Sequence, residues 1–417
     1  MEKKLTFIDL FAGAGGLSEG FIRAGFEPIA HVEMNKYASD TLKTRTAYHY
    51  LKEKKRLSEY YEYLKDDKIK KEDLWAKIPL NLINSVINKE ISEKSLKEIF
   101  NTIDKELNGE QVDLVIGGPP CQAYSVAGRA RDPKGMLDDP RNHLYKYYVK
   151  FLKKYKPKMF VFENVPGIMS ANNGDYLKLI FDAVKAEGYE LKIPPNKTLN
   201  SKDFNVLQDR KRVIIIGWRK ELNFDYPNFK KVDENYSILK DLFNDLPKIK
   251  NGQGNLGVVK YKKESTDYLL KHKIRNPLVD FTSQHISRPN NENDLEIYRI
   301  AVDMWNNQNK RLDYSSLPPS LIKHSNVKSF KNRFQVVNGN GISHTVVAHI
   351  AMDGHYYIHP DIYQNRSITI REAARIQSFP DDYFFEGSRT AAFKQIGNAV
   401  PVLMAEGIAK KIKSMLK

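Results

Sequence analysis

Cysteine is almost absent from this chain, since Cys121 is the only one among its 417 residues. A single cysteine excludes an intramolecular disulfide, leaves no metal site built from cysteines, and fits a reducing cytoplasm. Long apolar runs are also missing, because no stretch approaches the 18 apolar residues of a membrane span. The first residues enter a strand pattern directly and do not resemble a signal peptide. We therefore expect a cytoplasmic protein that does not act at a membrane.

Acidic residues are in the minority among the charged ones. The chain carries 67 Lys and Arg against 51 Asp and Glu, which gives a formal net charge of +16. Such an excess favours a polyanionic partner, most simply nucleic acid. The alternative is a compositional bias, because Lys, Asn, Ile and Tyr are all abundant.

The order of the elements predicts a doubly wound α/β domain. Residues 5–11 form a strand pattern, a glycine-rich turn follows, and a helix is expected from about 17 to 24 before a second strand at 27–32. Such domains bind ligands at the carboxyl ends of their strands. Further strands are expected at 112–116, 159–163 and 213–218, with an amphipathic helix at 142–155 and a final helix at about 401–416.

Two regions interrupt this alternation. Residues 45–108 are dense in Lys and Glu and have apolar residues at helical spacing (Leu80, Ile83 and Val86, for example), which predicts a helical insertion. From 222 to 340 the alternation fades into a segment rich in Asn, Lys, Tyr and Ser, which we assign to a second, smaller domain. The first domain then comprises 1–221 and 341–417. A hairpin is expected within 345–358, turning at Asp353-Gly354.

Cys121 stands in the segment Gly117-Gly118-Pro119-Pro120-Cys121-Gln122-Ala123-Tyr124-Ser125, directly after an apolar run. Gly-Gly-Pro-Pro fixes a stiff corner between strand and loop, and a thiol at such a corner is placed like a nucleophile. A lone cysteine is nevertheless more often a buried core residue. The other motifs of the chain favour the catalytic interpretation.

Those motifs occur in a fixed order: Phe7-Ile8-Asp9-Leu10-Phe11-Ala12-Gly13-Ala14-Gly15-Gly16-Leu17, then Phe162-Glu163-Asn164-Val165-Pro166-Gly167, then Gln208-Asp209-Arg210-Lys211-Arg212, then Arg371-Glu372-Ala373-Ala374-Arg375, and finally Gln395-Ile396-Gly397-Asn398-Ala399-Val400-Pro401. Together with the Cys121 segment, this set closely resembles the cytosine-C5 DNA methyltransferases. The resemblance covers roughly 1–45, 110–220 and 340–417. It implies a Rossmann-like, S-adenosylmethionine-dependent methyltransferase domain with a smaller, irregular target-recognition domain at 222–340.

The resemblance implies S-adenosyl-L-methionine as the cofactor. Glu33 follows the second strand and suits the hydroxyls of a ribose. The alternative is that Glu33 is an ordinary solvated carboxylate in a loop. In the family, Phe11 lies against the adenine. An acidic contact to the adenine is expected between Glu33 and Cys121, where Glu90 is a guess. The expected cofactor residues are Phe11, Ala12, Gly13, Gly15, Gly16, Leu17, Glu33, Met34, Pro119, Asn398 and Val400.

The resemblance also implies a reaction. Addition of the Cys121 thiolate to carbon 6 of cytosine makes carbon 5 nucleophilic, and Glu163 protonates N3. Arg212 contacts O2 of the base and Arg210 helps to orient the site. The base must be flipped out of the duplex, and a loop that closes over it would include Gln122, Ser125 and Arg129.

Several alternatives remain open at this stage. A branch of the same family methylates tRNA, a non-catalytic nucleic-acid-binding protein could keep the fold, and a nicotinamide oxidoreductase is disfavoured by the tight glycine pattern. We expect double-stranded DNA as the partner, a monomer, and a restriction endonuclease of the same specificity only as a separate protein. No metal is expected at the clustered histidines (His344, His349, His355 and His359). The charged residues Asp361, Arg366, Arg371, Glu372 and Arg375 are interpreted as architectural.

Overall fold

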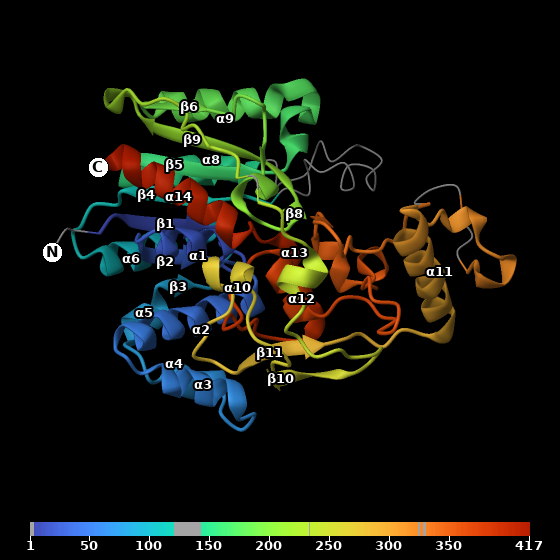
Figure 1. The fold of residues 1–417 in the computed structure, drawn as a ribbon. Helices are drawn as coiled ribbons and strands as arrows, with labels where there is room; N and C mark the ends of the chain where they lie inside the picture. The colour runs from blue at the N-terminus through green and yellow to red at the C-terminus, as the bar shows by residue number, and fades with distance from the viewer. Residues whose placement is uncertain (1–3, 121–142, 233, 324–325, 328–330) are drawn as a thin grey trace.

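A central, mostly parallel sheet organises the chain (Figure 1). The computed structural model describes residues 4–120, 143–232, 234–323, 326–327 and 331–417. The strand order is β3-β2-β1-β4-β5-β9-β6, with β7 also paired to β9. The strands are β1 (Thr6–Leu10), β2 (Glu27–Val32), β3 (Val86–Ile87), β4 (Leu114–Gly117), β5 (Met159–Asn164), β6 (Tyr189–Lys192), β7 (Leu199–Asn200) and β9 (Lys211–Arg219).

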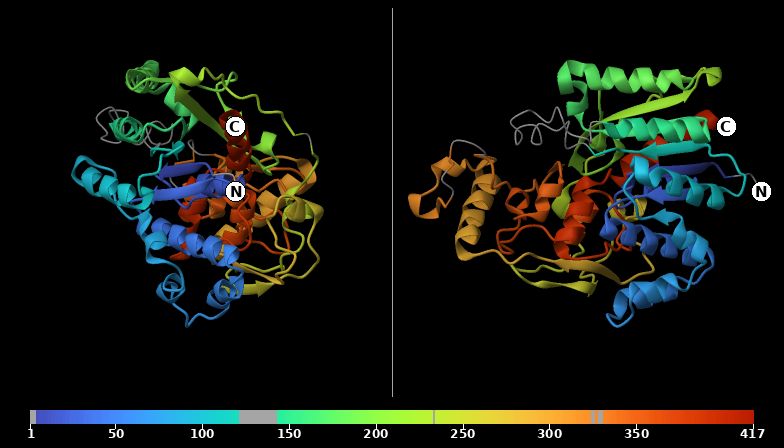
Figure 2. Two further views of the ribbon diagram at one scale, coloured as in Figure 1. Left: turned by 90° about the vertical axis from the view of Figure 1, so that its left-hand side faces the viewer. Right: turned by 180° about the vertical axis from the view of Figure 1, so that it is seen from behind.

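Helices cover both faces of this sheet, because successive strand residues point to opposite sides. Ile8 and Val115 face one apolar cluster, whereas Phe7 and Ile116 face the other. The first cluster is closed by α6 (Glu93–Leu107), α8 (Leu144–Tyr155) and α9 (Asp175–Ala186), and the second by α1 (Gly16–Arg23) and α14 (Val402–Leu416) (Figure 2). The predicted doubly wound α/β fold is confirmed. None of the helices in the described ranges is long and apolar enough to cross a lipid bilayer.

The order in which successive strands are added to the sheet reverses at β1. This strand pairs in parallel with β2 on one side and with β4 on the other, and β4 pairs in parallel with β5. A doubly wound sheet opens a crevice at the carboxyl ends of its strands where the order reverses. The segments that follow β1, β2, β4 and β5 therefore meet at one edge of the sheet.

Residues 45–84 fold into helices, as the spacing predicted. They comprise the second half of α2 (Lys36–Glu53), then α3 (Leu57–Lys65), α4 (Lys71–Trp75) and α5 (Leu80–Asn84). The helical assignment of Val86 was wrong, because Val86 begins β3. The backbone explains this difference, since the His31 amide donates to the Ser85 carbonyl at 2.9 Å and the Glu33 amide to the Ile87 carbonyl at 3.1 Å.

The second half of the chain is less regular. It contains the antiparallel pair β10 (Gly254–Lys260) and β11 (Phe281–Ile286), α10 (Asp267–Lys271) and α11 (Glu292–Gln308). Helix α11 stands apart from the sheet (Figures 1 and 2). One apolar cluster combines side chains from 238–274 with others from 337–402. Packing therefore continues across residue 340, and the division into domains at that residue stays a prediction.

The hairpin expected within 345–358 was wrong. Residues 348–351 and 355–357 form short 3₁₀ helices. The Tyr357 hydroxyl donates to the Thr345 carbonyl at 3.0 Å and accepts from the Val347 amide at 3.0 Å. A buried side chain thus satisfies backbone groups that a hairpin partner would otherwise satisfy. The nearby β12 (Ser343–His344) instead pairs in parallel with β8 (Gln208–Asp209).

Candidate active site

The turn after β1 is held close to the C-terminal part of the chain. Gly13 and Gly15 take positive φ values of 55° and 78°. A Cβ atom on Gly16 would lie 2.3 Å from the carbonyl oxygen of Val400, so only glycine fits at this contact. Val400 therefore borders the turn, as the motifs predicted. The Tyr383 hydroxyl also donates a hydrogen bond to the Ala14 carbonyl.

Glu33 lies beside this turn at the end of β2. Its carboxylate accepts hydrogen bonds from the backbone amides of Gly13 at 2.8 Å and Asn35 at 2.7 Å. Burial raises the pKa of this carboxyl above its ordinary value, although the amide donors oppose the shift. The next residue, Met34, is 61% exposed. The Asn88 side chain donates to the carbonyls of Glu33 and Met34 at 2.9 and 3.0 Å.

The other predicted cofactor residues fall into two groups. The side chains of Ala12, Leu17 and Pro119 are buried, so Leu17 packs in the apolar core between α1 and α14. Phe11 is half-buried, whereas Asn398 is exposed at the end of α13 (Arg389–Asn398). Glu90 is exposed as well, and its carbonyl accepts a hydrogen bond from the Ser95 hydroxyl.

Glu163 and Arg212 form an ion pair at the carboxyl edge of the sheet. The Arg212 Nε lies 2.8 Å from the Glu163 Oε1, and the two side chains are 10% and 15% exposed. The antiparallel register of β5 and β9 brings them together, because Glu163 is opposite Ile214. A Cβ atom on Gly118 would lie 2.5 Å from Glu163 Oε2, so the carboxyl lies against the backbone that leads toward Cys121.

Arg210 has different partners from Arg212, although both were predicted to be able to face one side of the strand. Its guanidinium is buried and donates to the carbonyls of Val346 at 2.6 Å and Gly397 at 3.3 Å. Arg210 lies between β8 and β9, so these contacts join the start of β9 to the C-terminal segment that borders the glycine-rich turn. Arg210 is therefore placed to hold the site together, whereas Arg212 reaches the catalytic carboxyl proposed from the motifs.

Four predicted residues lie outside the described residues: Cys121, Gln122, Ser125 and Arg129. The described chain stops at Pro120 on this side. The Pro119 carbonyl accepts a hydrogen bond from the Asn164 side chain at 3.3 Å. Asn164 directly follows Glu163, so one short segment touches both Arg212 and the chain before Cys121.

Sequence reasoning did not single out Tyr383, Asn88 or Asn164. Asn164 could have been found, since it adjoins Glu163 in the same motif. Tyr383 could not, because its partner Ala14 lies 369 residues away and no local pattern records such a contact.

Two of the clustered histidines, His344 and His355, form hydrogen bonds with other groups of the protein. Burial lowers the pKa of His344 to about 4 and that of His359 to about 3, so both are neutral near pH 7. His344 Nε2 lies 2.7 Å from the Tyr356 carbonyl oxygen, and His355 Nδ1 lies 2.8 Å from the Tyr298 hydroxyl. Within the described ranges, no group of three or more His, Cys, Asp and Glu side chains is arranged to hold a metal ion.

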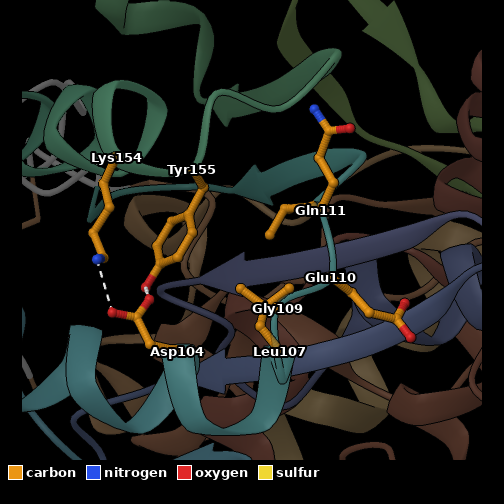
Figure 3. Close-up of a pocket in the computed structure, with 8 residues that line it drawn as sticks. Asp104, Leu107, Gly109, Glu110, Gln111, Lys154 and Tyr155 are labelled. Carbon is orange, nitrogen blue, oxygen red and sulfur yellow. Dashed lines mark hydrogen bonds and ion pairs between the residues drawn. The ribbon is translucent and has the colours of Figure 1, made fainter.

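A pocket of about 430 Å³ lies elsewhere, between α6 and α8 (Figure 3). Lys154 forms an ion pair with Asp104 at 2.8 Å across it, and the Tyr155 hydroxyl donates to the same carboxylate at 3.1 Å. Gln111 and Val112 precede β4, so this pocket adjoins the amino ends of the strands. It includes none of the predicted site residues.

Comparisons with known proteins find matches over almost the whole chain. Residues 5–74 and 71–414 match the family described as C-5 cytosine-specific DNA methylase. The type II methyltransferase M.Bpa9945I of Bacillus paralicheniformis is 41% identical over 99% of both chains. The type II methyltransferase M1.HphI of Haemophilus parahaemolyticus is 30% identical over 99% of this chain and 87% of its own. A solved structure of a proposed DNA modification methyltransferase from an E. coli prophage has a TM-score of 0.63 at 23% identity over 99% of both chains, which shows a shared fold.

Proposed function

The chain belongs to the C-5 cytosine-specific DNA methylase family, and from that premise we propose that it methylates carbon 5 of one cytosine within a short duplex sequence. It is a DNA cytosine-5 methyltransferase of the restriction–modification type. The observation that carries the finer proposal is the Glu163–Arg212 pair. This pair borders Gly118, three residues before Cys121, at the carboxyl edge of the sheet.

We propose S-adenosyl-L-methionine as the methyl donor, and the residues present fit it. A Cβ atom on Gly13 would meet nothing within 4 Å, so the turn borders open space. The half-buried Glu33 carboxylate suits ribose hydroxyls, and the exposed Met34 side chain offers apolar surface beside it. When bound, the donor supplies an electrophilic methyl group. Phe11, Asn398 and Val400 complete the proposed site.

The reaction proposed for the base divides one hard step into easier ones. The Cys121 thiolate adds to carbon 6 of cytosine, which breaks the aromaticity of the ring and makes carbon 5 nucleophilic. Glu163 gives a proton to N3, so the ring does not accumulate negative charge. After carbon 5 has gained the methyl group, it loses its proton to a water molecule and the thiolate leaves from carbon 6. N3 then returns its proton to Glu163, which restores the acid.

The two arginines have different tasks in this proposal. Arg212 holds the Glu163 carboxyl at 2.8 Å and has further N–H groups with which to bind O2 of the base. Arg210 is a positioning residue, because its guanidinium binds backbone carbonyls of the C-terminal segment. The target base must leave the stacked duplex to reach these groups. We propose that Gln122, Ser125 and Arg129 close over it.

We propose that 222–340 supplies the sequence-specific contacts to DNA and that 1–221 and 341–417 supply catalysis. Base edges in the major groove present a pattern that side chains can distinguish. A restriction endonuclease of matching specificity would be a separate protein. A monomer suffices, because all proposed catalytic groups come from one chain.

The proposal is tested by incubating the protein with S-adenosyl-L-methionine and duplex DNA of mixed sequence, and mapping 5-methylcytosine at base resolution. We expect methylation at one short motif by the wild type and none by Cys121→Ser, with both proteins equally folded. Duplex DNA carrying 5-fluorocytosine at the mapped site should remain covalently attached to the wild type, because fluorine cannot leave as a proton does. Methylation by Cys121→Ser at the wild-type rate would contradict the covalent mechanism.

A further inference from the structure

The apolar core around helix α3 of the insertion includes one residue from the segment 222–340 that we propose recognises DNA. The cluster around Tyr48, Tyr60 and Leu74 also contains Phe281, the first residue of β11. Phe281 is 7% exposed, so it is almost fully covered. Residues that lie more than 200 positions apart in the sequence therefore share one small core.

The contacts to Phe281 come from one face of α3. The Tyr61 ring meets the Phe281 ring edge-on, with centroids 5.8 Å apart and planes at 89°. The Lys65 ammonium lies 4.9 Å from the centre of the same ring. The Tyr61 hydroxyl also accepts a hydrogen bond from the Asn276 side chain, at 3.4 Å, in the segment that leads into β11.

The same helix holds the C-terminal segment 382–386. The Tyr60 hydroxyl donates to the Asp382 carbonyl, and the Tyr63 hydroxyl to the Glu386 carboxylate, both at 2.7 Å. That segment in turn binds β11, because the Gln284 side chain forms two hydrogen bonds with the backbone of Phe385, at 2.8 and 3.0 Å.

The segment 382–386 also contacts the glycine-rich turn after β1, because the Tyr383 hydroxyl donates a hydrogen bond to the Ala14 carbonyl. Helix α3 is thus fixed at once to β11 and to a segment that contacts the cofactor half of the molecule. Figure 1 shows α3 and α4 beside β10 and β11, below the sheet.

We infer that α3 is a brace for the β10–β11 pair, and that Tyr61 and Lys65 are positioning residues for DNA recognition. The inference rests on the proposed role of 222–340 in DNA binding. Since β11 leads directly toward α11, the position of Phe281 sets where the following recognition residues stand relative to the catalytic edge. The insertion would thereby make DNA affinity depend on its own packing.

The brace is tested with Tyr61→Ala, Tyr61→Phe, and Tyr50→Ala as a control. Tyr50 packs on the same cluster, but its ring carries Lys54 at 5.5 Å. Loss of the edge-on ring pair with Phe281 and of the hydrogen bond from Asn276 predicts that Tyr61→Ala raises the Kd for duplex DNA about tenfold. The Kd for S-adenosyl-L-methionine should stay within about twofold. Tyr61→Phe keeps the ring and should bind DNA almost as the wild type does.

Amide hydrogen exchange of the free protein separates this inference from the proposed function. In Tyr61→Ala we expect faster exchange at 254–260 and 281–286, with β1 and β4 unchanged, whereas Tyr50→Ala should leave β10 and β11 protected. Unchanged protection of β10 and β11 in Tyr61→Ala would overturn the brace. An equal loss of DNA and cofactor affinity would also overturn it, because that result indicates general unfolding. A wild type that fails to bind duplex DNA while Tyr61→Ala still exposes β11 would count against the proposed function alone.

Discussion

The carboxyl edge of the sheet and the junction around α12 (Ile370–Ile376) both contain arginine–carboxylate pairs, but they differ in how far those pairs are shielded from solvent. We call a pair sealed when both of its side chains are at most 3% exposed. At the edge, Glu163 and Arg212 are 15% and 10% exposed. At the junction, Arg375 binds Asp245 and Asp381, each at 2.6 Å, and all three side chains are 0–3% exposed. A pair that solvent can reach can also be reached by a ligand, whereas a sealed pair can only hold the chain together.

The surroundings of the two regions support this distinction. The Arg375 guanidinium also donates to the Leu242 carbonyl, so the junction joins 242–245 to α12. Arg366 and Glu372 form a second sealed pair with two contacts of 2.7 Å. By contrast, Glu163 borders the backbone at Gly118. The same residue types therefore serve architecture in one region and, by our proposal, chemistry in the other.

The largest expected effect comes from breaking a sealed pair. Arg375→Met should lower the free energy of unfolding by about 3–5 kcal/mol, because it leaves Asp245 and Asp381 buried with fewer cationic partners. Urea denaturation of both proteins measures this difference. Arg299→Met is the control, since its pair with Glu296 is about half exposed and should contribute under about 1 kcal/mol. Equal losses in the two variants would remove the distinction between sealed and open pairs.

The second prediction concerns the open pair. Glu163→Gln keeps the size of the side chain but removes the proposed acid, so kcat for methyl transfer should fall about a hundredfold or more. The free energy of unfolding should fall by less than it does in Arg375→Met, because the Glu163–Arg212 pair is more exposed than the pairs of Arg375 and the glutamine amide can still accept from Arg212. Methyl incorporation at saturating DNA and donor gives kcat. Glu190→Gln on β6 changes a carboxyl on the same sheet and should leave kcat unaltered. Full activity of Glu163→Gln would exclude Glu163 as the acid.

The two regions also differ in how far the sequence predicts them. Strands such as β5 and β9 were predictable, because short uninterrupted runs of apolar residues such as Val161 and Ile215 are typical of strands buried on both faces of a sheet. Glu163 and Arg212 were found because short motifs contain them. Arg366, Glu372 and Arg375 of the junction were interpreted as architectural from their motif, and their buried ion pairs agree with that interpretation. The partner Asp245 and the brace were not predicted, because Arg375–Asp245 and Tyr61–Phe281 join distant segments. Val86 was misassigned because a two-residue strand has too few residues to show a period.

The Asp9 carboxyl differs from those of both regions, because it is buried and has no cationic partner among the described residues. It lies on β1, is 1% exposed, and accepts a hydrogen bond from the Ser18 hydroxyl. Within the described ranges, no Lys, Arg or His forms an ion pair with it. Burial raises the pKa of Asp9 to about 8, and the nearby Glu33 carboxylate adds to the shift. The folded protein therefore holds a proton on Asp9 at pH values where the unfolded chain has lost it.

The raised pKa of Asp9 gives the smallest predicted effect, and the dependence of stability on pH measures it. Because the pKa of Asp9 is higher in the folded state, its stabilising contribution is complete below about pH 4 and is lost as the pH rises toward 8. Asp9→Asn mimics the protonated form, so the stability of the variant relative to the wild type should rise steadily as the pH increases from 5 to 8. Urea denaturation across that range measures the gain. The exposed Asp182→Asn should show no such trend. Parallel pH profiles for wild type and Asp9→Asn would mean that Asp9 ionises in the folded protein as it does in the unfolded chain, which would contradict the prediction.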